Sequence, residues 1–426
     1  MMMHAQTLFM STLVASFSWL AATHVVEQQV LIAPEAQHAG KTTGAKIQDA
    51  SASSVLRQFS HGRCGAGTGF VALGDSYSAG IGTGVEGEED DCRQGLHAHP
   101  QLIAADCGPT AFQFLSCTGA ATTNVMVGGE ESQLDRFNTS LSADFGLLSL
   151  GGNDLGFFEV MNACVFRFYN FYSGTCETAL AHSRALLESD EFENRLWIVI
   201  TEILDKIRWE KKPWFTITVT GYARFFNEVT DGCDEMSFGI WWGGPKLTKA
   251  LRTQMNTLVL AVNAKLRKTI EIINSNFTRD KVIFVDYDAA FDGHRFCEPN
   301  VTEPDYNRTD TWFFLVGGPD NARNDTQLPS EQRSDLKTLP PTSPLIDPVS
   351  CLGPARRSGD WGMLALCYMA MAKYHDPTLR PARGDLVALN SMWYVPTYYG
   401  KTFHPRSLGQ ETMRDGIYET WRRLEG

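Results

Sequence analysis

The sequence predicts an α/β fold in which helices cover both faces of a parallel sheet of five strands. Five short runs are apolar, nearly continuous and rich in β-forming residues. They are Gly69 to Leu73, Phe112 to Ser116, Phe145 to Leu150, Trp214 to Thr220 and Lys281 to Asp286. Such runs are typical of strands buried on both faces. The segments between them are long enough for crossover helices, which indicates a doubly wound sheet.

The clearest helix is predicted from Lys246 to Asn274, where apolar residues recur every three or four positions. They are Leu247, Leu251, Met255, Leu258, Val262, Leu266, Ile270 and Ile273. A second helix is predicted at the end of the chain, from Ser407 to Leu424. The segment from Asp360 to Tyr374 is rich in Met and apolar nearly all round, which favours a buried helix over a lid on a substrate cleft.

Three parts are predicted along the 426 residues. Residues 1–23 indicate a secretory signal peptide, because an apolar run too short for a membrane span precedes small residues. A buried or amphipathic N-terminal segment is the alternative. Residues 24–63 are polar and unpatterned, which indicates a flexible leader. Residues 64–426 then form one packed domain, with a long surface insertion around residues 298–395.

Composition excludes several classes of partner. The formal net charge of -12 argues against nucleic acid, which needs a surplus of Lys and Arg on one face.

The ten cysteines are even in number and lack paired CxxC motifs, which favours disulfides over a zinc site. Five N-glycosylation sequons agree with an extracellular location, and we expect a secreted monomer without a stable membrane span. The sequons begin at Asn138, Asn276, Asn300, Asn307 and Asn324.

Polar turns that contain glycine follow the first three predicted strands. They are GDSYS at 74–78, CTGA at 117–120 and GGND at 151–154. Because the carboxyl ends of parallel strands share one edge of an open α/β sheet, where ligands bind, we expect these turns to converge on one site.

The turns contain the groups that acyl transfer requires. Ser76 is expected to begin a helix, with an exposed hydroxyl and an unpaired backbone N–H. Gly119 lets a backbone N–H approach a substrate oxygen, and the amide of Asn153 can donate to the same oxygen, which would complete an oxyanion hole. His404, on a loop before the last helix, is the expected base. The alternatives are a helix cap for Ser76 and ordinary turns for Gly119 and Asn153.

The blocks GDSYS at 74, SCTGAAT at 116, GGND at 151 and FHPRSLGQETM at 403 resemble the four signature blocks of the GDSL (SGNH) hydrolase family, in the family's order. The resemblance covers about Gly69 to Met413 and is greatest to the secreted, disulfide-bonded esterase and lipase branch. It implies a flavodoxin-like three-layer α/β/α sandwich and ester hydrolysis without a cofactor or metal. It also implies that Ser76 is the nucleophile, His404 the base, and Ser76, Gly119 and Asn153 the oxyanion donors.

The same branch suggests disulfides for six of the cysteines, as Cys92–Cys117, Cys164–Cys176 and Cys233–Cys297. The remaining cysteines are then assigned to the pairs Cys351–Cys367 and Cys64–Cys107.

One position departs from the family pattern. Many members carry an Asp three residues before the catalytic His, where this chain has Lys401. A backbone carbonyl, such as that of Lys401, or another carboxylate would then orient the imidazole. His294, beside Asp292, is a rival base whose simpler role is to brace a loop. We favour His404 because its place before the last helix matches the family's base.

Two function classes remain open from the sequence. The first is a secreted esterase whose substrate is an acylated carbohydrate, a simple lipid or a phospholipid. The second, suggested by the missing Asp, is a non-catalytic protein that binds a glycan or a partner on the same fold. A G-x-S-x-G elbow and an H-E-x-x-H motif are both absent from the sequence, which argues against other hydrolase architectures.

Overall fold

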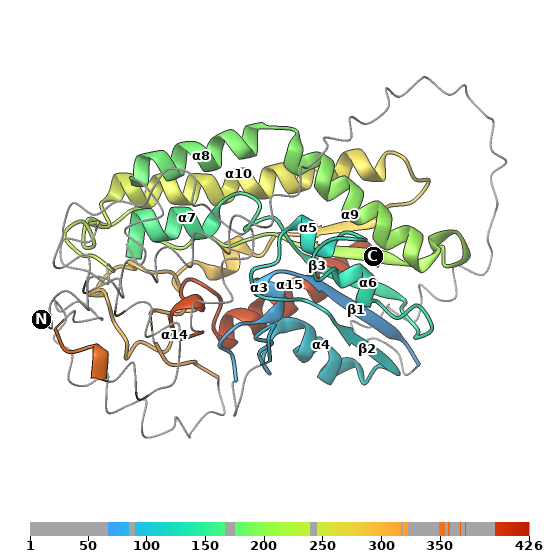
Figure 1. Cartoon of the computed structure of the whole chain (residues 1–426), viewed down its shortest axis with the longest axis horizontal. Coiled ribbons are helices and arrows are strands. Elements are labelled where there is room, and N and C mark those ends of the chain that lie inside the picture. Colours follow the sequence, from blue (N-terminus) through green and yellow to red (C-terminus); the bar gives the residue numbers. More distant parts are fainter. Residues whose placement is uncertain are drawn as a thin grey trace, which may run out of the picture. The chain divides into compact units, whose positions relative to one another are not determined.

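The computed structural model describes most of the chain downstream of the predicted leader (Figure 1). The described residues are 67–84, 90–166, 175–238, 245–316, 318–322, 349–353, 357, 367, 371 and 397–425. The predicted signal peptide and leader, the Asn324 sequon and nearly all of the predicted helix Asp360 to Tyr374 lie outside them.

Five parallel strands form one sheet in the order β2-β1-β3-β4-β5, which is the flavodoxin-like order. The predicted fold class and all five predicted strands are confirmed, with strand ends within two residues of those expected. The strands are β1 (Gly69–Gly74), β2 (Ala111–Phe114), β3 (Phe145–Ser149), β4 (Thr216–Thr220) and β5 (Val282–Val285).

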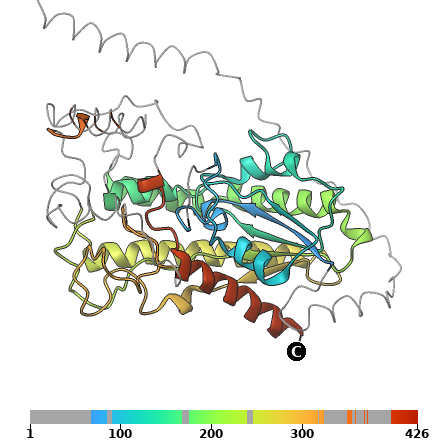
Figure 2. The ribbon, with the colours of Figure 1, turned by 90° about the horizontal axis from the view of Figure 1, so that it is seen from below.

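Helices cover the sheet on both faces, as Figures 1 and 2 show. Val71 and Leu73 of β1 point into the larger core beneath the side that carries α8, α9 and α10. Phe70 and Ala72 alternate with them and point into a smaller core under α4 and α15. The long helices are α4 (His99–Cys107), α8 (Cys176–Glu188), α9 (Glu191–Ile207), α10 (Lys249–Asn274) and α15 (Ser407–Glu425).

The predicted helix at 246–274 is confirmed, but it begins three residues later than expected. Thr248 is its N-cap, because the Thr248 side chain accepts a hydrogen bond from the N–H of Leu251 at 3.3 Å. The shorter helical segments are α3 (Ser76–Ala79), α5 (Thr122–Val125), α6 (Gln133–Arg136), α7 (Phe157–Met161), η1 (Asn162–Phe166), η2 (Trp209–Lys211), η3 (Asp288–Phe291) and α14 (Thr397–Gly400).

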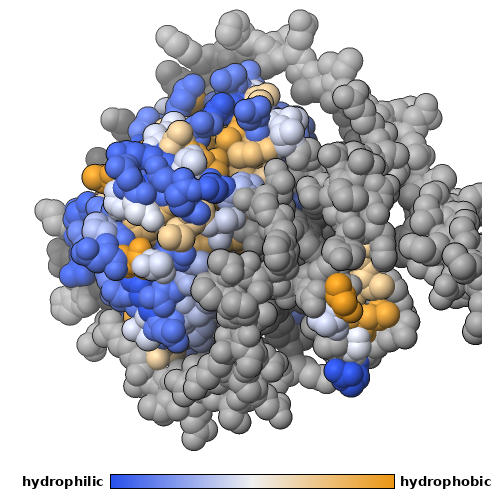
Figure 3. All heavy atoms as spheres, turned by 90° about the vertical axis from the view of Figure 1, so that its left-hand side faces the viewer, coloured by the Kyte–Doolittle hydropathy of each residue, from blue (hydrophilic) through white to orange (hydrophobic). Residues whose placement is uncertain are grey.

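On the face shown in Figure 3, hydrophilic side chains separate small hydrophobic patches. Large apolar side chains that are exposed in the described part of the chain occur on several different elements, for example Trp197 on α9 and Leu260 on α10. Single exposures of this kind are usual for folded proteins. Among the described helices, none combines the length and apolarity that a membrane span requires.

Four disulfides are present as predicted. They are Cys92–Cys117, Cys164–Cys176, Cys233–Cys297 and Cys351–Cys367. The fifth predicted pair includes Cys64, which lies outside the described residues.

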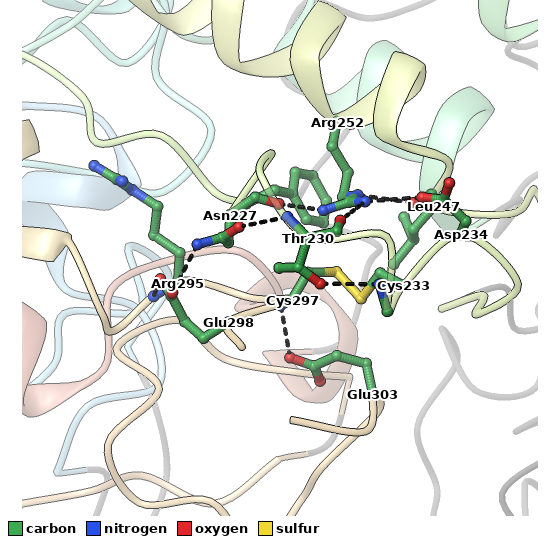
Figure 4. Close-up of a disulfide and its surroundings, with 12 residues drawn as sticks. Asn227, Thr230, Cys233, Asp234, Leu247, Arg252, Arg295, Cys297, Glu298 and Glu303 are labelled. Atoms are coloured by element: carbon green, nitrogen blue, oxygen red, sulfur yellow. Dashed lines mark hydrogen bonds and ion pairs between the residues drawn. A yellow bond between two sulfur atoms is a disulfide. The ribbon is translucent and has the colours of Figure 1, made fainter. Parts of the chain in front are cut away.

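Figure 4 shows how the segment after β4 is fastened to the body of the fold. Arg252 of α10 is fully buried, and its guanidinium donates to the carbonyl of Thr230 at 2.6 Å and to the carboxylate of Asp234 at 2.8 Å. The disulfide between Cys233 and Cys297 joins the same segment to the chain that follows β5. A buried cation and a covalent bridge therefore hold one loop against its neighbour.

We expect replacement of Cys233 and Cys297 by Ser to lower the free energy of unfolding by about 4 kcal/mol, because the bridge closes a loop of 64 residues. The Cys164–Cys176 bridge closes only 12 residues, so its removal should cost about 3 kcal/mol. Chemical denaturation of both double variants checks this order. A smaller loss for the Cys233–Cys297 pair would contradict it.

Candidate active site

The end of β1 places Ser76 at the start of a helix. Gly74 has φ +122°, and a Cβ there would lie 2.0 Å from the carbonyl oxygen of Ser149, so only glycine allows the two chains to pass this closely. Asp75 caps α3, and its side chain accepts the N–H of Tyr77 at 3.0 Å. Ser76 is therefore the first residue of α3, as the sequence predicts.

The structure brings Ser76 and His404 together although 328 positions separate them in the sequence. The Oγ of Ser76 lies 2.6 Å from Nε2 of His404. Both side chains are almost fully buried, at 6% and 4% exposure, so the expectation of an exposed Ser76 hydroxyl is wrong. This hydrogen bond has the geometry that a general base and its nucleophile require.

A main-chain carbonyl orients the imidazole. Nδ1 of His404 lies 3.1 Å from the carbonyl oxygen of Thr402. Because a carbonyl can only accept, the neutral ring carries its proton on Nδ1 and leaves Nε2 to accept from the hydroxyl of Ser76. The sequence suggests the carbonyl of Lys401 for this contact. That carbonyl accepts the backbone N–H of His404 at 2.9 Å instead, and the carbonyl at Nδ1 belongs to the next residue. The Lys401 ammonium lies over the ring of Phe314, 4.7 Å from its centroid.

Aromatic rings lie against the buried imidazole of His404. The ring centroid of His404 lies 5.1 Å from that of Tyr77 and 6.1 Å from that of Phe157. Burial lowers the pKa of His404 to about 4, although hydrogen bonds with the backbone of Thr402 and Lys401 oppose that shift. The imidazole is therefore neutral, and able to accept a proton, at any pH well above 4.

The residue before His404 is held in an unusual backbone conformation. Phe403 has φ +64°, in the left-handed region that non-glycine residues rarely adopt. Its buried ring packs against four others, and the hydroxyl of Tyr77 donates to its carbonyl at 2.9 Å. The four rings are those of Phe225, Phe226, Phe238 and Phe296. This cluster connects the loop fastened by Cys233–Cys297 to the turn that carries His404.

Two residues of the predicted insertion, Asp320 and Asn321, cap the helix α15 that follows His404. Asp320 accepts the backbone N–H of Ser407 at 2.9 Å and also accepts from its hydroxyl. The side chain of Asn321 accepts the N–H of Leu408 at 3.0 Å. Burial alone would raise the pKa of Asp320, but hydrogen bonds from His97, Ser407 and backbone amides outweigh it and lower that pKa to about 2. The N-terminus of α15, three residues from His404, is therefore fixed by an ionised carboxylate.

The three turns also bring the predicted oxyanion donors to the same edge of the sheet. Gly119 has φ +87°, which turns the chain after Cys117. Within the described residues, no acceptor is found for the backbone N–H of Ser76 or of Gly119. The amide of Asn153 donates to the carbonyl of Ala120 at 2.9 Å, which orients it and leaves its second hydrogen for another acceptor.

A buried carboxylate ties the second turn to the third. Asp154 accepts from the backbone N–H of Thr122 at 3.0 Å and from its hydroxyl at 2.5 Å. Burial raises the pKa of Asp154 above its usual value, and these hydrogen bonds and the charge of Arg195 oppose that shift. The second and third turns are therefore linked twice, through Asp154 and through Asn153.

Sequence reasoning missed two contributors to the site. Tyr222 follows β4 and hydrogen-bonds to Asp75, and Asp154 links two turns. The Asp of the GGND motif is visible in the sequence beside Asn153, whereas a lone tyrosine after a strand has no distinctive pattern. The sequence does predict a backbone carbonyl as one possible partner of the imidazole, and in the structure this carbonyl belongs to Thr402 rather than Lys401.

The rival histidine makes a different set of contacts. The ring of His294 stacks on that of Trp312 at 3.7 Å, and its Nδ1 donates to the carbonyl of Asp310 at 2.8 Å. These contacts are those of a side chain that braces a loop. In the described part of the chain, no three His, Cys, Asp or Glu side chains are grouped so that they could hold a metal ion.

No protein-family model matches the chain. Lipase 1 of Streptomyces coelicolor is 37% identical over 164 residues, which are 38% of this chain and 54% of that lipase. The match thus spans about half the length of that relative. A lipase of Streptomyces rimosus is 28% identical over 231 residues, or 54% of this chain and 74% of the relative.

Two solved structures from the same genus align with the chain. The phospholipase A1 from Streptomyces albidoflavus NA297 has a TM-score of 0.43 and 29% identity, over 59% of this chain and 88% of its own. The extracellular lipase from Streptomyces rimosus has a TM-score of 0.41 and 28% identity, over 56% and 89%.

We predict that the imidazole of His404 titrates near pH 4, whereas an exposed histidine titrates near 6.5. The measurement is an NMR titration of the ring nitrogens, in which Nε2 should show the shift of an unprotonated nitrogen from pH 7 down to about pH 5. A midpoint for His404 at pH 6 or above would contradict the water-excluded environment.

Proposed function

The chain belongs to the GDSL (SGNH) hydrolase family, and on this premise we propose that it is a serine esterase with Ser76 as nucleophile and His404 as general base. The observation that carries the proposal is the 2.6 Å contact between Oγ of Ser76 and Nε2 of His404. It lies at the edge of the sheet where unpaired backbone N–H groups also meet.

The proposed reaction uses these groups in two steps. His404 takes the hydroxyl proton as Ser76 attacks the ester carbonyl, and the negative oxygen accepts hydrogen bonds from the N–H groups of Ser76 and Gly119 and from the amide of Asn153. Collapse of the tetrahedral intermediate expels the alcohol, which takes its proton from the imidazolium. Water activated by His404 then releases the acid from the acyl-enzyme.

The carbonyl of Thr402 takes the part that a carboxylate has in a triad. It fixes the tautomer of the imidazole and stabilises the imidazolium through a dipole rather than a full charge. Since the pKa of His404 is about 4, the base stays unprotonated in mildly acid medium, and its own protonation lowers activity only as pH falls toward 4.

An apolar acyl group is the substrate feature that the surroundings of Ser76 favour. The half-buried ring of Phe157 lies edge-on to His404 and tilted against Phe225, with centroids 5.6 Å apart. An aromatic wall beside the base suits an acyl chain better than the hydroxyls of a sugar. We therefore place lipid esters before acylated carbohydrates, in keeping with the lipases among the relatives.

Secretion and glycosylation belong to the same proposal. The four disulfides suit an oxidising compartment, and one of the matched structures is an extracellular lipase. The sequons that fall in the described residues all have an exposed asparagine, as attachment of a glycan requires. They are Asn138, Asn276, Asn300 and Asn307.

A non-catalytic binding protein is the second candidate, and the Lys at position 401 is the observation that favours it. A fluorophosphonate probe separates the two candidates. An activated Ser76 reacts covalently with the probe, and the reaction disappears in Ser76→Ala, whereas a binding protein leaves the probe unreacted.

We expect Ser76→Ala and His404→Ala each to lower kcat on p-nitrophenyl esters by about 10⁴-fold or more. Asn153→Ala should lower it by about 10²-fold to 10³-fold, because one oxyanion donor is lost. The control is His294→Ala, which removes a histidine that stacks on Trp312 and should keep kcat within about twofold. Turnover that survives in Ser76→Ala would refute the assignment of the nucleophile.

We expect Phe157→Ala to change the preference for acyl-chain length. Loss of the aromatic wall should lower kcat/KM for octanoate esters about tenfold relative to acetate esters. Phe277→Ala is the matched control, since this half-buried ring packs on Trp209 away from the catalytic contact and should leave the ratio unchanged. An unchanged ratio in Phe157→Ala would count against an apolar acyl site there.

A further inference from the structure

Tyr222 lies where β4 leaves the sheet, and the body of the fold fixes its backbone. Asn263 of α10 accepts its N–H at 2.9 Å and donates to its carbonyl at 2.8 Å. Tyr222 is 7% exposed, and its ring meets the ring of Tyr77 edge-on, with centroids 5.0 Å apart. The hydroxyl therefore reaches the site from an anchored position.

That hydroxyl joins two of the three turns. It donates to Oδ2 of Asp75 at 2.6 Å and accepts the backbone N–H of Gly152 at 3.0 Å. Asp75 precedes the nucleophile Ser76, and Gly152 precedes the oxyanion donor Asn153. One side chain thus bridges the nucleophile turn and the oxyanion turn.

We propose that Tyr222 is a positioning residue, whose hydroxyl holds Gly152 and thereby places the amide of Asn153 relative to Ser76. The inference rests on the proposed function and extends it to a fourth strand of the sheet. It assigns Tyr222 no contact with substrate and no proton transfer.

The geometry of the oxyanion turn makes such a holder necessary. Gly151 and Gly152 are adjacent, and glycine has the greatest backbone freedom of any residue. Gly151 has φ +124°, and its Cα faces the ring of Phe192 so closely that a Cβ would lie 2.6 Å from it. That contact limits the turn from one side, and the hydrogen bond from the Gly152 N–H limits it from another.

Burial and the acceptor Asp75 fix the direction in which the Tyr222 hydroxyl donates. Burial raises the pKa of Tyr222 well above 10, so the phenol stays protonated and donates. Asp75 also accepts from the N–H of Tyr77 and from the hydroxyl of Ser149, each at 3.0 Å. Because the phenol proton points to Asp75, the phenol oxygen is left to accept from Gly152.

Tyr222→Phe tests the inference, because it removes the hydroxyl and keeps the ring. We expect kcat on p-nitrophenyl esters to fall about tenfold, with KM within about twofold, since the oxyanion donor is displaced and the acyl site is intact. Tyr287→Phe is the matched control. Its hydroxyl is equally buried but has no hydrogen-bond partner in the described structure, so both constants should stay within about twofold.

A double-mutant cycle with Asn153→Ala separates positioning from general stability. If Tyr222 acts through Asn153, Tyr222→Phe should have little further effect on kcat in the Asn153→Ala background. The inference is overturned if the double variant loses kcat by the product of the two single fold-losses. It is also overturned if the kcat of Tyr222→Phe equals that of Tyr287→Phe.

Hydrogen exchange at Gly152 gives a readout that needs no turnover. The Gly152 amide should exchange at least tenfold faster in Tyr222→Phe than in Tyr287→Phe, and equal rates would overturn the inference even if the wild-type chain lacks esterase activity. Lack of activity in the wild type refutes the proposed function instead. Should Tyr222→Phe not fold, Asp75→Asn is the second variant. Its amide oxygen can still accept from Tyr77 and Ser149, but the NH2 group that then faces Tyr222 cannot accept the phenol proton, so kcat must fall without a rise in KM.

Discussion

The site depends on one hydrogen bond between a hydroxyl on the first strand's turn and an imidazole near the end of the chain. Neither partner is held by its immediate sequence alone. Ser76 is fixed by a strand end, a glycine and an N-cap, whereas His404 is fixed by a carbonyl two residues before it, by Phe403 and by the cap on α15. The contact therefore forms only when the sheet, the phenylalanine cluster and the Asp320 cap on α15 are all in place.

The fold could be predicted because its signals are local. A strand buried on both faces must be apolar along its whole length, so β1 and β3 are visible in a single sequence. The turns at their ends could be placed on one edge because parallel strands share a direction. α10 begins three residues later than predicted. The apolar pattern already includes Leu247, but Thr248 caps the helix and sets its start.

The site was predictable only as far as its chemistry depends on residue type. Ser76, Asn153 and His404 are unusual residues in motif positions, and the structure brings Ser76 and His404 into contact. Tyr222 contributes through a hydroxyl whose role depends on where the ends of β1 and β4 lie. Thr402 contributes through a carbonyl whose role depends on the backbone conformation of the turn before His404. The lowered pKa of His404 likewise arises from burial among the rings of Tyr77 and Phe157, and burial is a property of the assembled fold.

The use of Thr402 in place of a carboxylate has a consequence for acid tolerance. An aspartate beside a catalytic histidine can itself gain a proton, and the ring then loses the acceptor that holds its tautomer. A peptide carbonyl does not titrate in water, so acid leaves the acceptor at Nδ1 of His404 unchanged. A protein exported into acidified surroundings would keep an aligned base until the imidazole itself is protonated.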